Sequence, residues 1–423
     1  MAVQISPAIK DAVRKLMAHE GIKKALAYLE ANQQARIDEL KEMTLLHGAP
    51  FKEGELRSPM FVKKLEAYGC TECATDTNDN AFGTIKGSGQ GSRQGSRKPP
   101  TVLLEAHLDT VFPAETPLAV REEGTRIYCP GVGDDTAGLA TVLSVCRAIR
   151  HAGLKPVHDI LLAGTSGEEG EGDLRGIKGL LRDHPEIGAH LALEPWPFGY
   201  FTKDGVGSRR YEVIFRGPGG HSFLAFGLPS PLHAMGRAIA KMAETRTPAS
   251  PKTTYTVGVV SGGTSVNSIA FEGRMKIDMR STSQEELLAL EKKVLAFMRE
   301  AAEEETAFWR AGGEKITVEC VRIGDRAAGS QPGSSPIVQA AFAAAEALDV
   351  SPRLTDPSST NSNASIGLGI PSLVVRTGGD TGNTHNLEEW FDTKGAEKGD
   401  MGALLMLFLL AGLDGVTAPV PLK

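Results

Sequence analysis

Short apolar runs alternate with amphipathic segments over most of the chain, and this alternation predicts a sheet covered by helices. Residues 101–107, 159–164 and 189–194 are typical of buried strands, because each run is short and bounded by polar or glycine residues. Residues 136–153 and 173–184 show the three-to-four-residue apolar spacing of helices. Strands that alternate with helices indicate an α/β fold with a mostly parallel sheet, which binds ligands beyond the carboxyl ends of its strands.

The pattern changes near Gly207, where longer alternating strands and two longer helices follow one another. Their order is strand, helix, strand, strand, helix, strand, and the second helix opens with the capping box Ser283-x-x-Glu286. This order is typical of an α+β split βαβ unit. We therefore expect an inserted domain over residues 207–324, and a larger domain formed by residues 1–206 and 325–423.

Length and charge narrow the class of protein. A chain of 423 residues with 41% hydrophobic residues exceeds what one core usually supports, which agrees with two domains. The net charge of -6 gives no general attraction to nucleic acid or to an anionic membrane. Residues 1–30 lack a signal-peptide core, and the apolar run 401–413 is too short to span a bilayer. We expect a soluble, cytoplasmic protein without nucleic-acid or membrane partners.

The cysteines agree with a reducing compartment. Five in so long a chain are sparse and odd in number, which favours free thiols. Cys70-Thr71-Glu72-Cys73 could be half of a zinc site, but no second pair completes it, so ordinary packing is the better interpretation. The five are Cys70, Cys73, Cys129, Cys146 and Cys320.

A low-complexity segment, residues 86–100, lies between two strand-like runs and is rich in Gly, Ser and Arg. We expect a long hairpin loop there. Nucleic-acid contact through Arg93 and Arg97 is a weak alternative, because no aromatic residues accompany them.

Potential metal ligands gather at the strand ends. Taken singly, each has an ordinary explanation as a core histidine, a helix cap or a charged strand end. Together they would place several uncompensated carboxylates at one edge of a sheet, and a shared cation removes that repulsion. Carboxylates mixed with imidazoles suit Zn²⁺, with Mn²⁺ or Co²⁺ as substitutes. The residues are His107, Asp109, Asp134, Asp135, Glu168, Glu169, Glu194 and, far downstream, His385.

The motifs that carry these residues resemble those of the M20 family of co-catalytic zinc hydrolases, which includes peptidase T-like aminopeptidases, carboxypeptidases and N-acyl amino acid deacylases. The matching motifs are "HLDTV", "GDDTAG", "GTSGEEG", "LALEP", "RGPGGHSF" and "NTHNLEE". The resemblance implies a zinc-hydrolase catalytic domain that binds two Zn²⁺ per chain, and an inserted lid or dimerisation domain. Thr136 and Asn361 depart from residues frequent in the family, which weakens the transfer of any particular substrate.

The resemblance also implies a role for each ligand. Asp134 would bridge the two metals. His107 and Glu194 would complete one metal site, and Glu169 and His385 would complete the other.

Residues that bind no metal have implied roles as well. Asp109 would hold His107, and Glu168 would be the general base that takes a proton from water and returns it to the leaving amine. This assignment explains the adjacent glutamates of "GTSGEEGEG", since Glu169 binds metal and Glu168 does not.

In the inserted domain, His221 and Asn267 resemble family positions that reach an active site, commonly that of a partner subunit. His221 would stabilise the oxyanion, although a histidine in a turn can also be structural. Arg280 could bind a substrate carboxylate in bidentate fashion, or form a structural ion pair. The implied assembly is a homodimer formed through residues 207–324.

The leading hypothesis is a dizinc exopeptidase that acts at the amino end of di- and tripeptides. An N-acyl amino acid deacylase or a carboxypeptidase is the alternative, because all three cleave an amide with the same metal ligands. A non-catalytic binding protein would be expected to have lost a ligand or the base. A glycosidase that uses Glu168 and Glu194 would leave the histidines and Asp134 unexplained.

Overall fold

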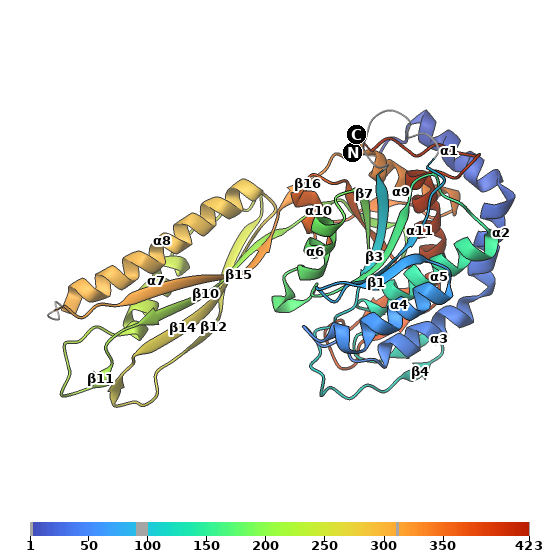
Figure 1. Cartoon of the computed structure of the whole chain (residues 1–423). Coiled ribbons are helices and arrows are strands. Elements are labelled where there is room, and N and C mark those ends of the chain that lie inside the picture. Colours follow the sequence, from blue (N-terminus) through green and yellow to red (C-terminus); the bar gives the residue numbers. More distant parts are fainter. Residues whose placement is uncertain (1–2, 90–99, 310–312, 423) are drawn as a thin grey trace. The chain divides into compact units, whose positions relative to one another are not determined.

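The structure, a computed structural model, describes residues 3–89, 100–309 and 313–422, and its contacts divide the chain into two units (Figure 1). Unit 1 comprises residues 1–205 and 330–423, and unit 2 comprises residues 206–329. Unit 2 is therefore an insertion into unit 1.

Unit 1 is built on an eight-stranded sheet with the order β1-β2-β6-β3-β7-β18-β8-β17. Its four neighbouring strands β6, β3, β7 and β18 are parallel, so their carboxyl ends lie at one edge. The predicted α/β class with a mostly parallel central sheet is confirmed. The strands are β1 Thr71–Thr75, β2 Ala81–Ile85, β3 Thr101–His107, β6 Ile160–Thr165, β7 Ile187–Glu194, β8 Tyr200–Thr202, β17 Arg353–Leu354 and β18 Ser372–Arg376.

Helices cover both faces of this sheet, which is why β3 and β6 are buried along their whole length. On one face, Val102 and Leu104 pack into the core that includes α5 and α11. On the other face, Leu103 packs with Leu161 and with apolar residues of α6. The helices of unit 1 are α1 Pro7–Ala18, α2 Glu20–Ala31, α3 Gln33–Thr44, α4 Arg57–Ala67, α5 Thr136–Ala152, α6 Arg175–Asp183, α9 Pro336–Ala347, α10 Ser362–Gly367 and α11 Ala396–Ala411, with the 3₁₀ turns η1 Glu53–Glu55 and η2 Gly170–Gly172.

Helix α5 directly follows the aspartate pair of the predicted site, and its ends follow the usual chemistry of helix termini. Asp135 caps the amino end by accepting a hydrogen bond from Gly138 N at 3.2 Å. Gly153 ends the helix at φ 64°, a conformation that favours glycine. The sequence prediction for residues 136–153 is therefore confirmed.

A second, antiparallel sheet of unit 1 has the order β19-β20-β5-β4. It holds the loop between β19 and β20, which carries His385. Its strands are β4 Arg121–Glu123, β5 Arg126–Tyr128, β19 Asp380–Gly382 and β20 Trp390–Asp392, and the short pieces β9 Asp204–Gly205 and β16 Gly329–Ser330 lie near the unit boundary.

The expectation of a hairpin loop over residues 86–100 is wrong in its topology. Strand β6 lies between β2 and β3, so the segment joins two strands that are not neighbours. Residues 90–99, with Arg93 and Arg97, lie outside the described part of the chain. The sequence could not show this, because β6 comes later in the chain and inserts between the two runs.

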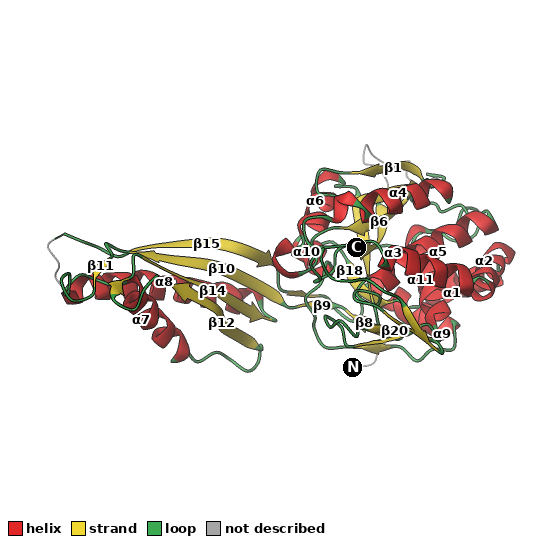
Figure 2. Ribbon diagram, turned by 90° about the horizontal axis from the view of Figure 1, so that it is seen from below, coloured by secondary structure: helices red, strands yellow, loops and turns green. Residues whose placement is uncertain are grey.

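Unit 2 has a four-stranded antiparallel sheet with the order β12-β14-β10-β15, and α7 and α8 lie on one side of it (Figure 2). The predicted order of strands and helices is observed, and Ser283 Oγ accepts a hydrogen bond from Glu286 N at 3.3 Å, as the capping box requires. The elements are β10 Gly207–Arg216, β11 Gly220–His221, α7 Pro231–Ala243, β12 Thr253–Gly262, β13 Ser268–Ile269, β14 Glu272–Ser281, α8 Gln284–Trp309 and β15 Thr317–Arg326.

Residues 401–411 of the apolar carboxyl-terminal run lie in α11, whose residues are almost all buried in the core of unit 1. Within the described residues, no helix has both the length and the apolarity to cross a membrane. All five cysteines fall in this described part and are free thiols.

Candidate metal centre and active site

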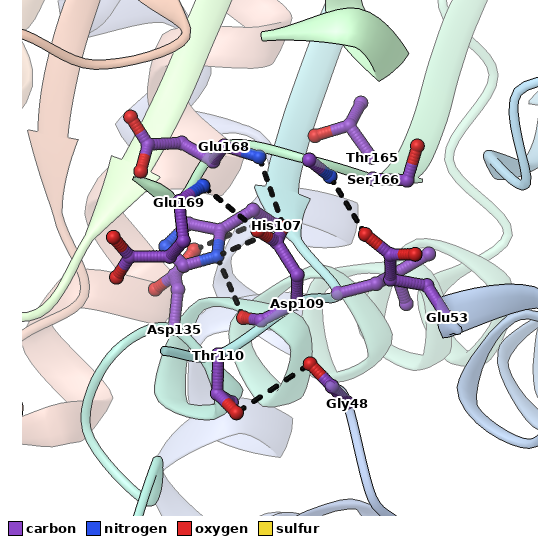
Figure 3. Close-up of polar contacts among 12 residues, drawn as sticks. Gly48, Glu53, His107, Asp109, Thr110, Asp135, Thr165, Ser166, Glu168 and Glu169 are labelled. Carbon is purple, nitrogen blue, oxygen red and sulfur yellow. Dashed lines mark hydrogen bonds and ion pairs between the residues drawn. The ribbon is translucent and has the colours of Figure 1, made fainter. Parts of the chain in front are cut away.

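Three predicted ligands meet at the carboxyl edge of the central sheet. Ligand atoms of His107, Asp134 and Glu169 all lie within 4.8 Å of one another. His107 ends β3, Asp134 precedes α5, and Glu169 follows β6, so three chain segments bring them together. Figure 3 shows His107 beside the turn that carries Glu168 and Glu169.

Asp134 lies between the two histidines of the predicted ligand set. Its Oδ1 is 2.9 Å from His107 Nε2, and its Oδ2 is 3.3 Å from His385 Nε2. His385 Nε2 is also 2.8 Å from Glu169 Oε1. The two oxygens of one carboxylate thus face two different imidazoles, an arrangement suited to a ligand shared by two cations.

The electrostatics of this group call for positive charge. Burial alone would lower the pKa of His107, but the nearby carboxylates of Asp109 and Asp134 raise it well above its usual value. Hydrogen bonds to Asp134 and Glu169 raise the pKa of His385 to about 10. Without a metal, the carboxylates would therefore favour protonation of both imidazoles. A divalent cation would offset the negative charge of the same carboxylates. The donor set fits a divalent metal.

Glu194 belongs to the same electrostatic environment. It ends β7, the neighbour of β3, and burial followed by the charge of Asp134 raises its pKa well above the usual value. Among the described residues, the tight group of three ligands does not include Glu194 or Glu168. Of the two adjacent glutamates, only Glu169 belongs to this group of three ligands.

Four consecutive backbone N–H groups hold the turn that carries these glutamates. Asn80 Oδ1 accepts from Ser166 N at 3.0 Å, and Glu53 Oε1 accepts from Gly167 N at 3.0 Å. Asp109 accepts from the next two, with Oδ1 3.0 Å from Glu168 N and Oδ2 2.7 Å from Glu169 N (Figure 3). Three side chains from separate segments therefore fix residues 166–169, which we call the glutamate turn.

Asp109 consequently does more than its implied role of holding His107. His107 Nδ1 lies 2.9 Å from the main-chain oxygen of Asp109 but 3.6 Å from its carboxylate Oδ1. The main-chain oxygen is the hydrogen-bond partner at that distance, since 3.6 Å is too long. Asp109 orients His107 through its backbone and the glutamate turn through its side chain.

Two further buried carboxylates hold the segments around Asp134. Glu389 accepts hydrogen bonds from the backbone N–H groups of Gly131, Gly133 and Asp134 at 3.0, 2.9 and 2.8 Å. Asp135 Oδ2 accepts from His107 N at 3.1 Å. Glu53, Glu389 and Asn80 were not predicted from the sequence, because each contacts a segment distant in the chain. Glu53 and Glu389 are buried glutamates, which are rare in proteins, but that signal is visible only in the fold.

The three predicted residues of unit 2 lie in two places. His221, on β11, and Asn267 are adjacent, because β11 pairs with β13 and Asn267 O accepts from Ser222 N at 3.0 Å. His221 Nδ1 accepts from the backbone N–H groups of Phe223 and Leu224 at 3.2 and 3.4 Å. A neutral His221 therefore carries its proton on Nε2.

Arg280 lies on β14, in the four-stranded sheet and not in the β11–β13 pair. Its Nε donates to Asp278 Oδ2 at 2.7 Å, so it forms the structural ion pair that was one of the two alternatives for it.

Comparison with known proteins gives a consistent picture. The model of Peptidase family M20/M25/M40 matches residues 103–406. Among solved structures, an aminopeptidase PepT from Bacillus cereus is 22% identical with a TM-score of 0.69, covering 89% of this chain and 98% of its own. A tripeptidase from Staphylococcus aureus is 20% identical with a TM-score of 0.71 and the same coverage. A dinuclear metal-binding M20 peptidase from Bacillus subtilis is 14% identical with a TM-score of 0.65, covering 90% of this chain and 99% of its own.

Proposed function

Because this chain belongs to peptidase family M20/M25/M40, we propose that it is a dinuclear zinc exopeptidase that removes the amino-terminal residue of di- and tripeptides. Membership makes the chain a hydrolase of the metallopeptidase and metal-dependent amidohydrolase class, as its motifs indicated. The observation that carries the proposal is the position of Asp134, with one carboxylate oxygen toward His107 and the other toward His385.

We assign the metal ligands as His107, Asp134, Glu169, Glu194 and His385, with Zn²⁺ as the metal and Mn²⁺ or Co²⁺ as substitutes. When bound, two such cations polarise the substrate carbonyl and lower the pKa of the attacking water, so that it can lose a proton near neutral pH. The glutamate turn holds Glu168 next to Glu169 through the Glu168 N–H, and we assign Glu168 as the base. Its carboxylate takes the proton of the attacking water and passes it to the leaving amine.

We assign His221 to stabilising the oxyanion of the tetrahedral intermediate. Its protonated nitrogen is Nε2, because Nδ1 accepts two backbone N–H groups, and Nε2–H is the donor that such a role needs. Asn267, beside it, is assigned to binding substrate. Arg280 is assigned to binding a substrate carboxylate in bidentate fashion; Asp278 accepts its Nε–H and would hold the guanidinium in place for that contact.

A homodimer formed through unit 2 is part of the proposal. Strand β12 is an edge of the four-stranded sheet and exposes Val259 and Val260, each 53% accessible. An exposed apolar edge strand favours pairing with a second copy. Light scattering at micromolar concentration should give the mass of two chains, and a monomer would contradict this assembly.

The adjacent glutamates provide the sharpest test of the mechanism. Glu168→Gln should keep both metals, since no coordinating atom changes, and should lower kcat by on the order of 10²–10⁴-fold because the base is lost. Glu169→Gln should lower the metal content, because a neutral amide is a poorer ligand than a carboxylate, and excess zinc should restore part of the activity. Metal analysis and turnover across a zinc titration measure both. Metal loss in Glu168→Gln with retention in Glu169→Gln would require the two roles to be exchanged.

Substrate class needs a separate experiment. A panel of free tripeptides and N-acetyl amino acids should show cleavage of the tripeptides, as the names of the PepT and tripeptidase structures lead us to propose. Activity on the acylated compounds alone would instead favour the deacylase alternative, and release of the carboxyl-terminal residue would favour a carboxypeptidase.

A further inference from the structure

Glu53 is a fully buried carboxylate that the mechanism above does not use. It lies in η1, ahead of α4, and is 0% exposed. One oxygen, Oε1, accepts the Gly167 N–H at 3.0 Å, and the other, Oε2, is 2.6 Å from Arg175 Nη2. A buried carboxylate needs partners for both oxygens, and here one partner is the turn that carries the catalytic glutamates.

Gly167 is the residue of that turn whose conformation is most restricted. Its φ is 64°, where side chains other than glycine are strained, and a Cβ built there would lie 2.7 Å from Arg175 Cγ. Arg175 also donates from Nη1 to Asn78 O at 2.7 Å. Arg175, which pairs with Glu53, therefore also lies against Gly167. Glu53 and Arg175 together restrict the position of this residue.

We propose that Glu53 is a positioning residue that sets the direction of Glu168 by holding the Ser166–Gly167 peptide through the Gly167 N–H. The Ser166–Gly167 peptide lies one residue ahead of the two peptides that flank Glu168, both of which Asp109 holds through the N–H groups of Glu168 and Glu169. Glu53 therefore fixes the entry to the turn, at Gly167, and Asp109 fixes the rest. Rotation of the Ser166–Gly167 peptide would displace the Glu168 carboxylate, and a displacement of about 1 Å can cost on the order of 10²-fold in rate. This inference rests on the proposed role of Glu168 as base, but the hydrogen bond itself can be tested separately.

Three variants and one matched control test the proposal. Glu53→Ala removes the acceptor. Glu53→Gln keeps an oxygen for the Gly167 N–H but turns an NH2 group toward Arg175 in place of the second oxygen. Glu53→Asp keeps the charge but withdraws the acceptor by one methylene. The control is Glu39→Ala, because Glu39 is another buried glutamate, 5% exposed, that is bound to Tyr68 and to Arg147 at 3.0 Å.

The expected kinetic result is a change in kcat alone. With tri-alanine as the probe substrate, Glu53→Ala should lower kcat by about 10- to 100-fold, with KM and zinc content close to wild type. Glu53→Gln should recover most of the loss, and Glu39→Ala should keep the wild-type kcat. An equal loss in Glu53→Gln, or in Glu39→Ala, would overturn the positioning role. If Glu53→Ala is insoluble, Glu53→Asp gives the same comparison.

Hydrogen exchange of the Gly167 amide tests the hydrogen bond without any substrate. Exchange should accelerate in Glu53→Ala, stay close to wild type in Glu53→Gln, and stay unchanged in Glu39→Ala. Unchanged protection in Glu53→Ala would overturn the proposal. If the wild-type protein cleaves neither tri-alanine nor an N-acetyl amino acid, the proposed function fails, and the exchange result alone decides whether Glu53 holds the turn.

Discussion

Replacing Asp109 with Asn tests whether the glutamate turn depends on a single buried carboxylate. Asp109 is fully buried and accepts two backbone N–H groups, one at each oxygen. Burial alone would raise the pKa of Asp109, but His107 and the N–H groups of Glu169 and Glu168 lower it, so the side chain is a carboxylate at neutral pH. Asparagine has one acceptor oxygen, so one N–H would face an amide N–H instead.

The magnitude follows from these contacts. Hydrogen bonds to a charged acceptor contribute about 1.5–3 kcal/mol each, and a buried N–H left unpaired costs about 1–3 kcal/mol. We expect Asp109→Asn to lower the free energy of unfolding by about 2–4 kcal/mol. Because His107 Nδ1 bonds the main-chain oxygen of residue 109, the tautomer of His107 should not change.

The assay combines urea unfolding with turnover of a tripeptide. Asp109→Asn should lower kcat by about 10- to 100-fold in protein that is still folded, because the glutamate turn is misplaced. Asp400→Asn is the matched control, since Asp400 is a fully buried aspartate that pairs with Arg36 at 3.2 Å. It should lose stability but not kcat. If Asp109→Asn keeps the wild-type kcat and stability, or if the control loses as much activity, the assigned role of Asp109 is wrong.

Three further predictions concern stability. Gly399→Ala should lower the free energy of unfolding by about 3 kcal/mol or more, because a Cβ there would collide with the backbone oxygen of Thr377. Gly236→Ala, at an exposed position of α7 where a Cβ meets nothing within 4 Å, should instead raise the free energy of unfolding by up to about 1 kcal/mol; urea unfolding measures both. Burial raises the pKa of Asp400 in the folded state, so the folded state binds its proton at a higher pH than the unfolded chain does. As pH falls through the folded pKa, the free energy of unfolding of the wild type should therefore rise relative to that of Asp400→Asn. The gain should level off below the unfolded pKa. Removing metal with a chelator should lower the Tm, and added zinc should restore it. A free zinc concentration of one hundred times the Kd should restore about 2.7 kcal/mol of the free energy of unfolding. An unchanged Tm would argue against a structural contribution of metal.

The sequence pointed to the candidate ligands because their chemistry coincides with regular local patterns. His107 and Glu194 end short apolar runs typical of buried strands, Glu169 lies in the loop that follows a third such run, and Asp134 precedes a helix with a clear beginning and end. Parallel strands bring such positions to one edge without any knowledge of distant contacts.

The residues that hold the site could not be predicted in the same way. Glu53 lies in a polar segment before α4 and acts on Gly167, and Glu389 follows Glu388 in an acidic pair. Nothing local distinguishes the buried member of that pair from the exposed one, since only the fold decides which carboxylate meets the N–H groups of Gly131, Gly133 and Asp134. The order of strands around residues 86–100 was mistaken for the same reason.

The long separation between the two histidines has a consequence during synthesis. His107 enters the chain in its first third, while His385 enters near its end and reaches Asp134 only after unit 2 has been made. A nascent chain on the ribosome therefore holds Asp134 and its neighbouring carboxylates without the imidazole that completes the group. With the proposed ligands, His107, Asp134 and Glu194 are all made before unit 2, whereas the site that includes His385 can form only near the end of synthesis. Capture of that second metal would be a late event, and metal limitation during growth should increase the fraction of newly made chains degraded rather than the loss of mature protein.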